Sequence, residues 1–111
     1  MAATAAAVAV LRDIGAPVDR AVGAWLLARR GEKGGFCAAP RTPLPDLLST
    51  AVALHALARM NVHLDQICKS ATEFVDTLWH PEGGFFGHWG DDALDCEYTF
   101  YGLLALGHLA Q

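Results

Sequence analysis

The amino-acid sequence predicts an all-α protein built from repeated pairs of helices, arranged as an α/α toroid or solenoid. Three observations predict this fold. The chain repeats itself at an offset of 49 positions, one segment of each repeat is apolar on nearly every side, and another is apolar on one side only. Such a pair of helices cannot bury its own apolar surface, so neighbouring pairs must stack against it.

The repeat is anchored on two glycines and a phenylalanine. Gly34-Gly35-Phe36 recurs as Gly83-Gly84-Phe85, 49 positions later and without a gap. The same offset joins further identical residues, among them Asp46 and Asp95, Thr50 and Thr99, Leu54 and Leu103, and Leu57 and Leu106. We therefore divide the single domain, residues 1–111, into an inner helix over 1–16, a first full repeat over 17–63 and a second over 64–111.

The first two helices are expected over residues 1–16 and 17–30. Val8 falls 49 positions before Leu57, so the N-terminal segment matches the inner helix of the next repeat. Pro17 is acceptable in the first turn of the following helix, and Gly31 is a stop signal just past its end. The glycine pair then predicts a sharp loop, because only glycine adopts positive φ at low cost.

The next two helices differ in how their apolar residues are spaced. Residues 47–60 are apolar almost all round, which is typical of a buried inner helix. Residues 64–79 place apolar side chains at three- and four-residue steps, with charged residues on the other side, as expected of an amphipathic outer helix. With the inner helix that follows Asp95, the chain should form about five helices that alternate between inner and outer layers.

Composition and charge exclude several functions. The net charge of −4 comes with no cluster of basic residues beyond Arg29-Arg30, so we expect neither nucleic acid nor an anionic membrane as partner. Cys37, Cys68 and Cys96 are odd in number and far apart, which argues against a disulfide framework and a zinc finger and favours the cytoplasm. The apolar residues 1–11 are too few to span a bilayer.

The Gly-Gly-Phe loop, followed by Leu44-Pro45-Asp46 and an apolar helix, resembles the repeats of protein prenyltransferase β subunits, in particular that of the Rab-type geranylgeranyltransferase. The resemblance implies an α/α toroid whose cavity binds a prenyl diphosphate, with a zinc ion held by an Asp, a Cys and a His. It places Asp46 on the zinc Asp, Leu48 on the Cys and Tyr98 on the His. Leucine and a protonated tyrosine cannot replace a thiolate and an imidazole, so we predict no metal ligand and leave Zn²⁺ and Mg²⁺ open as cofactors.

The candidate site residues are acids and tyrosines of the inner helices and the loops before them. We assign catalytic roles to Asp46, Asp95 and Tyr98, and substrate binding to Asp91, Asp92 and Tyr101. The sequence Asp91-Asp92-Ala93-Leu94-Asp95 has the spacing with which class I isoprenoid enzymes hold diphosphate through Mg²⁺. The alternative is that Asp46 caps one inner helix, that Asp92 or Asp95 caps the next, and that the tyrosines are core aromatics with satisfied hydroxyl groups.

Two functions remain open at this point. The first is a prenyltransferase-like protein that binds or acts on a prenyl diphosphate or another isoprenoid, with a degraded zinc site. The second is a non-catalytic repeat scaffold for protein interaction or lipid binding, so whether the chain is an enzyme stays undecided. Because the sequence begins and ends within expected inner helices, we expect both ends of the stack to be completed by further repeats, a partner subunit or self-association.

Overall fold

The computed structural model describes residues 1–110, which form five α-helices and no β-strand. The helices are α1 (Ala2–Asp13), α2 (Arg20–Ala28), α3 (Leu47–Arg59), α4 (Cys68–Thr77) and α5 (Cys96–Leu109). The predicted all-α class is therefore confirmed. None of these helices is long and apolar enough to cross a membrane.

The two outer helices are shorter than the sequence predicts. We expected residues 17–30 and 64–79, whereas α2 begins at Arg20 and α4 at Cys68. α2 begins late because the side chain of Asp19 caps it, with Oδ1 accepting a hydrogen bond from the Ala21 amide at 2.8 Å. Both helices end early because the residues after them turn back and pair with the phenylalanine of the glycine loop.

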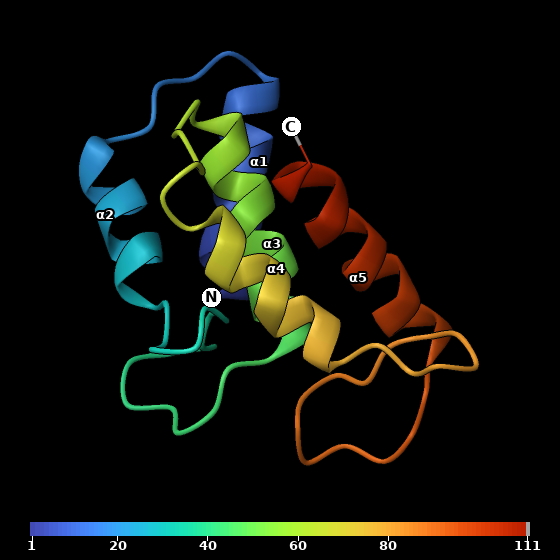
Figure 1. Ribbon diagram of the computed structural model, residues 1–111. Helices are drawn as coiled ribbons and strands as arrows, with labels where there is room; N and C mark the ends of the chain where they lie inside the picture. The colour runs from blue at the N-terminus through green and yellow to red at the C-terminus, as the bar shows by residue number, and fades with distance from the viewer. Residues whose placement is uncertain (111) are drawn as a thin grey trace.

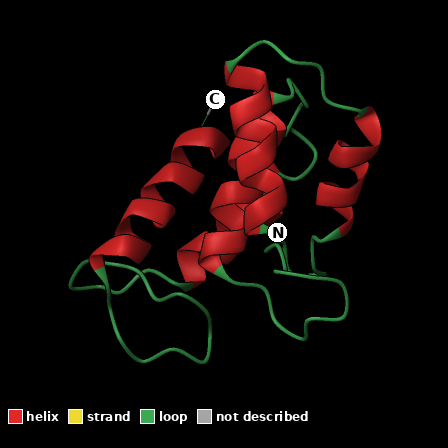
Figure 2. Ribbon diagram, turned by 180° about the vertical axis from the view of Figure 1, so that it is seen from behind, coloured by secondary structure: helices red, strands yellow, loops and turns green. Residues whose placement is uncertain are grey.

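The inner helices form a row. α3 contacts α1 on one side and α5 on the other, while α2 packs on α3 and α4 packs on α5. In Figure 1, α1, α3 and α5 run upward and α2 and α4 run downward, so successive helices are antiparallel. Figure 2 shows the same row from behind, with α5 at the left and α2 at the right. Each outer helix therefore packs on the inner helix that follows it in the chain.

The 49-residue offset is reproduced in the backbone contacts of the two glycine loops. Arg30 forms an isolated antiparallel bridge with Phe36, and Trp79 forms one with Phe85. The hydrogen bond from the Cys37 amide to the Arg29 carbonyl recurs as Phe86 to Leu78, each with a length of 2.9 Å. The two loops share one backbone design, as the sequence repeat predicts.

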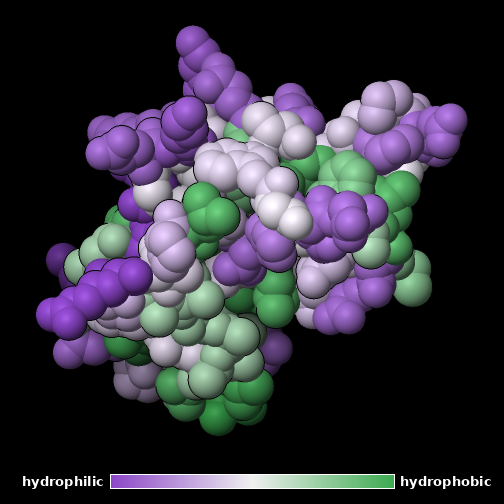
Figure 3. All heavy atoms as spheres, turned by 90° about the horizontal axis from the view of Figure 1, so that it is seen from below, coloured by the Kyte–Doolittle hydropathy of each residue, from purple (hydrophilic) through white to green (hydrophobic). Residues whose placement is uncertain are grey.

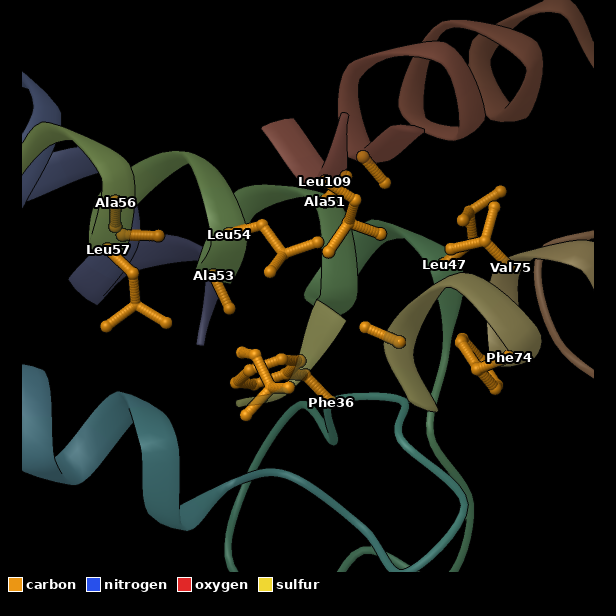
Figure 4. Close-up of a cluster of buried hydrophobic side chains, with 14 of the residues drawn as sticks. Phe36, Leu47, Ala51, Ala53, Leu54, Ala56, Leu57, Phe74, Val75 and Leu109 are labelled. Carbon is orange, nitrogen blue, oxygen red and sulfur yellow. The ribbon is translucent and has the colours of Figure 1, made fainter. Parts of the chain in front are cut away.

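The hydrophobic core lies between the row of inner helices and the outer layer. Phe36 and Phe85 are both buried, so each glycine loop inserts its aromatic ring into this core. Figure 4 shows Leu47, Leu54 and Leu57 along α3 with Phe36 on the same side of the helix. The Thr50 hydroxyl, also buried, accepts a hydrogen bond from the Phe36 amide at 2.9 Å and so fastens the loop to α3.

Backbone contacts also join neighbouring repeats. The Met1 ammonium donates a hydrogen bond to the Ala38 carbonyl at 2.8 Å. The Leu47 amide donates to the Gly87 carbonyl at 2.7 Å, and Gly87 lies 49 positions after Ala38. The starts of α1 and α3 are thus each held by the loop of the following repeat.

Candidate functional site

Two of the predicted catalytic residues cap the inner helices. The carboxylate of Asp46 accepts hydrogen bonds from the amide and the hydroxyl of Ser49, at 2.7 and 2.8 Å, at the start of α3. Asp95 does the same for α5, where Oδ1 accepts from the Glu97 amide at 2.7 Å. The capping interpretation is therefore confirmed for both. Because both aspartates lie at helix N-termini, both carboxylates lie at the end of the molecule where α3 and α5 begin.

Tyr98 lies where these carboxylates converge. Its ring packs on Gly87 so closely that a Cβ added to this glycine would lie 2.5 Å from the ring. Partial burial raises the pKa of the Tyr98 phenol, and the negative charges of Asp91, Glu97, Asp95 and Asp46 raise it further. Tyr98 therefore keeps its proton at neutral pH and can serve as a hydrogen-bond donor.

Asp91 lies in the loop before α5 and is held by the backbone. Its Oδ1 accepts from the Ala93 amide at 3.1 Å and its Oδ2 from the Gly87 amide at 3.2 Å. These two hydrogen bonds lower the pKa of the Asp91 carboxyl, because they stabilise its charged form. Asp92, next to it, is exposed.

Tyr101 lies one turn beyond Tyr98 on α5. Its hydroxyl is 3.4 Å from Oε1 of Glu97, a long hydrogen bond. Burial raises the pKa of Tyr101, and Glu97 raises it further. The structure thus brings five of the six predicted residues, together with Glu97, to the end of the molecule where α3 and α5 begin. Asp92 is an exposed residue of the loop before α5.

The cluster is acidic. The four carboxylates around Tyr98 would repel a diphosphate unless a cation lay between them. Within residues 1–110, no three His, Cys, Asp or Glu side chains are placed to share one metal ion. Mg²⁺, however, is commonly held by one or two carboxylates together with substrate phosphates, so the cluster is suited to a metal that arrives with its ligand. Figure 3, seen from below, shows this end of the molecule, where hydrophilic and hydrophobic side chains lie side by side.

One side of the inner row is left open by the outer helices. On α3, Leu48 and Val52 are half-buried, whereas Leu47, Leu54 and Leu57 on the other sides of this helix are fully buried. Tyr101, the counterpart of Val52, and Leu104 are half-buried in the same way on α5. We call the surface of Leu48, Val52, Tyr101 and Leu104 the open side. These four side chains are apolar apart from the Tyr101 hydroxyl, and Leu48 lies in the first turn of α3, which starts directly after Asp46. The pair of His55 and His108 follows on the same side, further along the two helices.

A pair of histidines was missed by the sequence analysis. Nδ1 of His55 on α3 lies 3.0 Å from Nε2 of His108 on α5, so one ring donates a hydrogen bond to the other. The five histidines look dispersed along the chain, and neither residue belongs to a ligand motif. The separation of 53 positions was the available signal, because it exceeds the repeat of 49 by about one helical turn.

His108 should make the stability of the protein depend on pH. Burial and the neighbouring His55 lower its pKa from the usual 6.5, and its Nδ1 is buried without a hydrogen-bond partner in residues 1–110. The folded state then binds fewer protons than the unfolded state, so stability should fall as the pH drops through about 6.5. We expect the thermal midpoint of the wild type to fall between pH 8 and pH 5.5, and this fall to shrink in His108→Leu.

His63→Leu is the matched control, because His63 is exposed. This variant should keep the wild-type difference between the two pH values. An equal fall in His108→Leu and in the wild type would show that His108 is not responsible.

A cavity of about 560 Å³ lies away from the carboxylate cluster. It is bounded by the end of α1, by α2 and by the turn after α3, and its lining includes Arg12, Arg20 and Met60. None of the predicted site residues lines it.

Comparison with family models gives no match to this chain, and comparison with curated proteins gives no significant match.

Proposed function

We propose that the chain is a prenyltransferase-like repeat protein of α/α-toroid type that binds an isoprenoid along its open side. The observation that carries this proposal is the meeting of two features, a cluster of carboxylates around Tyr98 and an apolar surface that begins beside it. The resemblance of the glycine loops and of the sequence around Asp46 to prenyltransferase repeats supplies the class of ligand.

The open side suits the hydrocarbon part of such a ligand. Leu48 and Val52 on α3 and Tyr101 and Leu104 on α5 present apolar surface that the rest of the chain does not fully cover. Burying that surface under a polyisoprenoid chain would stabilise the complex by about 25 cal/mol per Å² of apolar area, less the cost of ordering the ligand.

The carboxylate cluster suits a diphosphate only through a cation. In this proposal Asp91 and Asp95 hold Mg²⁺, which neutralises the head group, while Tyr98 and Tyr101 donate hydrogen bonds to phosphate oxygens. The chain itself supplies no metal-activated nucleophile in this arrangement, so binding, and not transfer of the prenyl group, is the activity we propose.

Titration with geranylgeranyl diphosphate and with geranylgeraniol, followed by tryptophan fluorescence, tests the two parts separately. We expect both ligands to bind saturably, and only the diphosphate to bind more tightly when Mg²⁺ is added. Asp95→Asn should abolish this gain without unfolding the protein, because asparagine caps a helix as well as aspartate does. Leu104→Glu should weaken both ligands at least about tenfold, which corresponds to 1.4 kcal/mol.

Ile14→Glu is the matched control for the charge, since Ile14 is exposed just after α1, at the opposite end of the molecule from Asp46 and Asp95. It should leave both affinities unchanged. Failure of both ligands to saturate, with and without Mg²⁺, would refute the proposal.

A second candidate function is a non-catalytic scaffold for protein interaction. The observation that favours it is the outward side of α5, where Phe100 and Leu103 are 60% and 61% exposed. Exposed apolar side chains that adjoin one another on a helix are typical of a surface that binds another protein.

A further inference from the structure

We propose that two copies of this chain associate head to tail, with the outward side of α5 of one copy packed on the outward side of α1 of the next. The inference deepens the scaffold candidate. Leu104 belongs both to the open side and to the proposed junction, so the two proposals are tested with different variants. The inference follows from the repeat itself, since the contact between α3 and α5 within the chain shows how a further inner helix would pack on α5.

The outward side of α5 is the counterpart of a covered side of α3. Phe100, Leu103 and Gly107 lie 49 positions after Ala51, Leu54 and Ala58. Ala51 and Leu54 are fully buried on α3, which packs against α1 and α5, whereas Phe100 and Leu103 are exposed on α5, which packs against α3 and α4. The exposed residues on the outward side of α5 therefore occupy repeat positions that are buried on α3.

The outward side of α1 matches the side that α5 packs against α3. Ala7 and Leu11 lie twice the repeat, 98 positions, before Ala105 and Leu109, and the residues are identical at both positions. Ala105 and Leu109 are buried on α5, while Ala7 and Leu11 are exposed on α1. The α1 helix of a second copy can therefore pack on α5 with the same two residue types that α5 buries within its own chain.

Polarity and size are also complementary at this junction. Within the chain, His55 of α3 meets His108 of α5. At the junction, the position of His55 is taken by Leu104 of one copy and the position of His108 by Val10 of the next copy. Both residues are apolar, so no polar side chain would be buried there without a hydrogen-bond partner. The same offsets put bulky Phe100 at the position of small Ala51 and small Ala3 at the position of bulky Tyr101, which exchanges the sizes and keeps their sum approximately equal.

The junction covers inner helices only. Gly34 and Gly35 are covered by α4, whereas the junction proposed here brings α1 to α5 and places no outer helix over Gly83 and Gly84. The contact is therefore smaller than the one between repeats within the chain, and we expect a reversible, concentration-dependent association.

Sedimentation velocity over a series of concentrations tests the proposal with one blocked side at a time. Leu103→Glu blocks the α5 side and Ala7→Glu blocks the α1 side, and both residues are exposed, so both variants should fold with wild-type helix content. Each variant alone should stay monomeric, because every head-to-tail contact needs one intact side of each kind. An equimolar mixture should form a species of twice the monomer mass.

Leu44→Glu, an exposed leucine away from both ends of the row, should associate as the wild type does. Self-association of Ala7→Glu alone would show that α5 packs on α5, and self-association of Leu103→Glu alone would show that α1 packs on α1. Either result overturns the inference, as does a wild type that stays monomeric or a mixture that does not associate. The Leu103→Glu variant, as a monomer, should still bind isoprenoids, because Leu103 is not part of the open side. Titrating it with isoprenoids therefore tests ligand binding separately from self-association.

Discussion

Replacing Gly34 with alanine should reduce the free energy of unfolding by at least about 4 kcal/mol, enough to unfold many small domains. Gly34 has a φ of +95°, and a Cβ added to it would lie 2.1 Å from the carbonyl oxygen of Ser70. Ser70 belongs to α4, and its carbonyl is backbone, so the helix would have to move away from the loop. Chemical denaturation of the purified variant, followed by circular dichroism, measures the loss.

Gly83→Ala is the matched control, because Gly83 occupies the same position in the second loop. Its φ is +101°, but no atom lies within 4 Å of the added Cβ. Only the strain of a left-handed conformation remains, about 1–2 kcal/mol. Equal losses in the two variants would show that α4 does not pack closely on the first loop.

The difference between the two glycines explains what holds successive repeats together. The glycines of the first loop have no Cβ, and this allows α4 to approach the loop backbone. Gly35 is enclosed between Pro45 and the ring of Phe74, at 2.7 and 2.8 Å from its added Cβ. The second loop has the same Gly-Gly-Phe sequence but no following outer helix in residues 1–110. The glycine pair therefore serves both the turn and the packing between repeats.

Much of this fold could be predicted because the repeat and the helix periodicity carry the same information. The offset from Phe36 to Phe85 predicted two equivalent loops, and the two phenylalanines are indeed buried in equivalent bridges. The starts of the outer helices could not be predicted as well. Pro17 fits a helical first turn, but the capping hydrogen bond of Asp19 determines where α2 begins.

In the candidate site, too, some features follow from the local sequence and others depend on the folded structure. Asp46 and Asp95 were placed at helix starts by the sequence alone, since an aspartate before an apolar helix is typical of a cap. That Asp91 also acts on Tyr98 depends on the path of the loop over 86–95, which no local pattern determines. The contact between His55 and His108 likewise depends on how two inner helices are aligned.

The offset predicts one environment for Leu54 and Leu103, and the structure gives them two. Leu54 is 0% exposed between two inner helices, while Leu103 is 61% exposed at the end of the row. Leu54→Ala should therefore cost about 2–5 kcal/mol of unfolding free energy, because it leaves a cavity in the core. Chemical denaturation at a concentration where the protein is monomeric measures this effect.

Leu103→Ala, measured under the same conditions, should change the unfolding free energy by no more than about 0.5 kcal/mol, as is usual for surface substitutions. At concentrations where copies associate, the same variant should lower the apparent stability, because the loss of the α5 contact weakens the mass-action stabilisation of the folded state. A large cost at low concentration would mean that residue 103 is already covered within one chain. A repeated sequence specifies which residues can be buried, and the number of neighbours in the row determines which of them are.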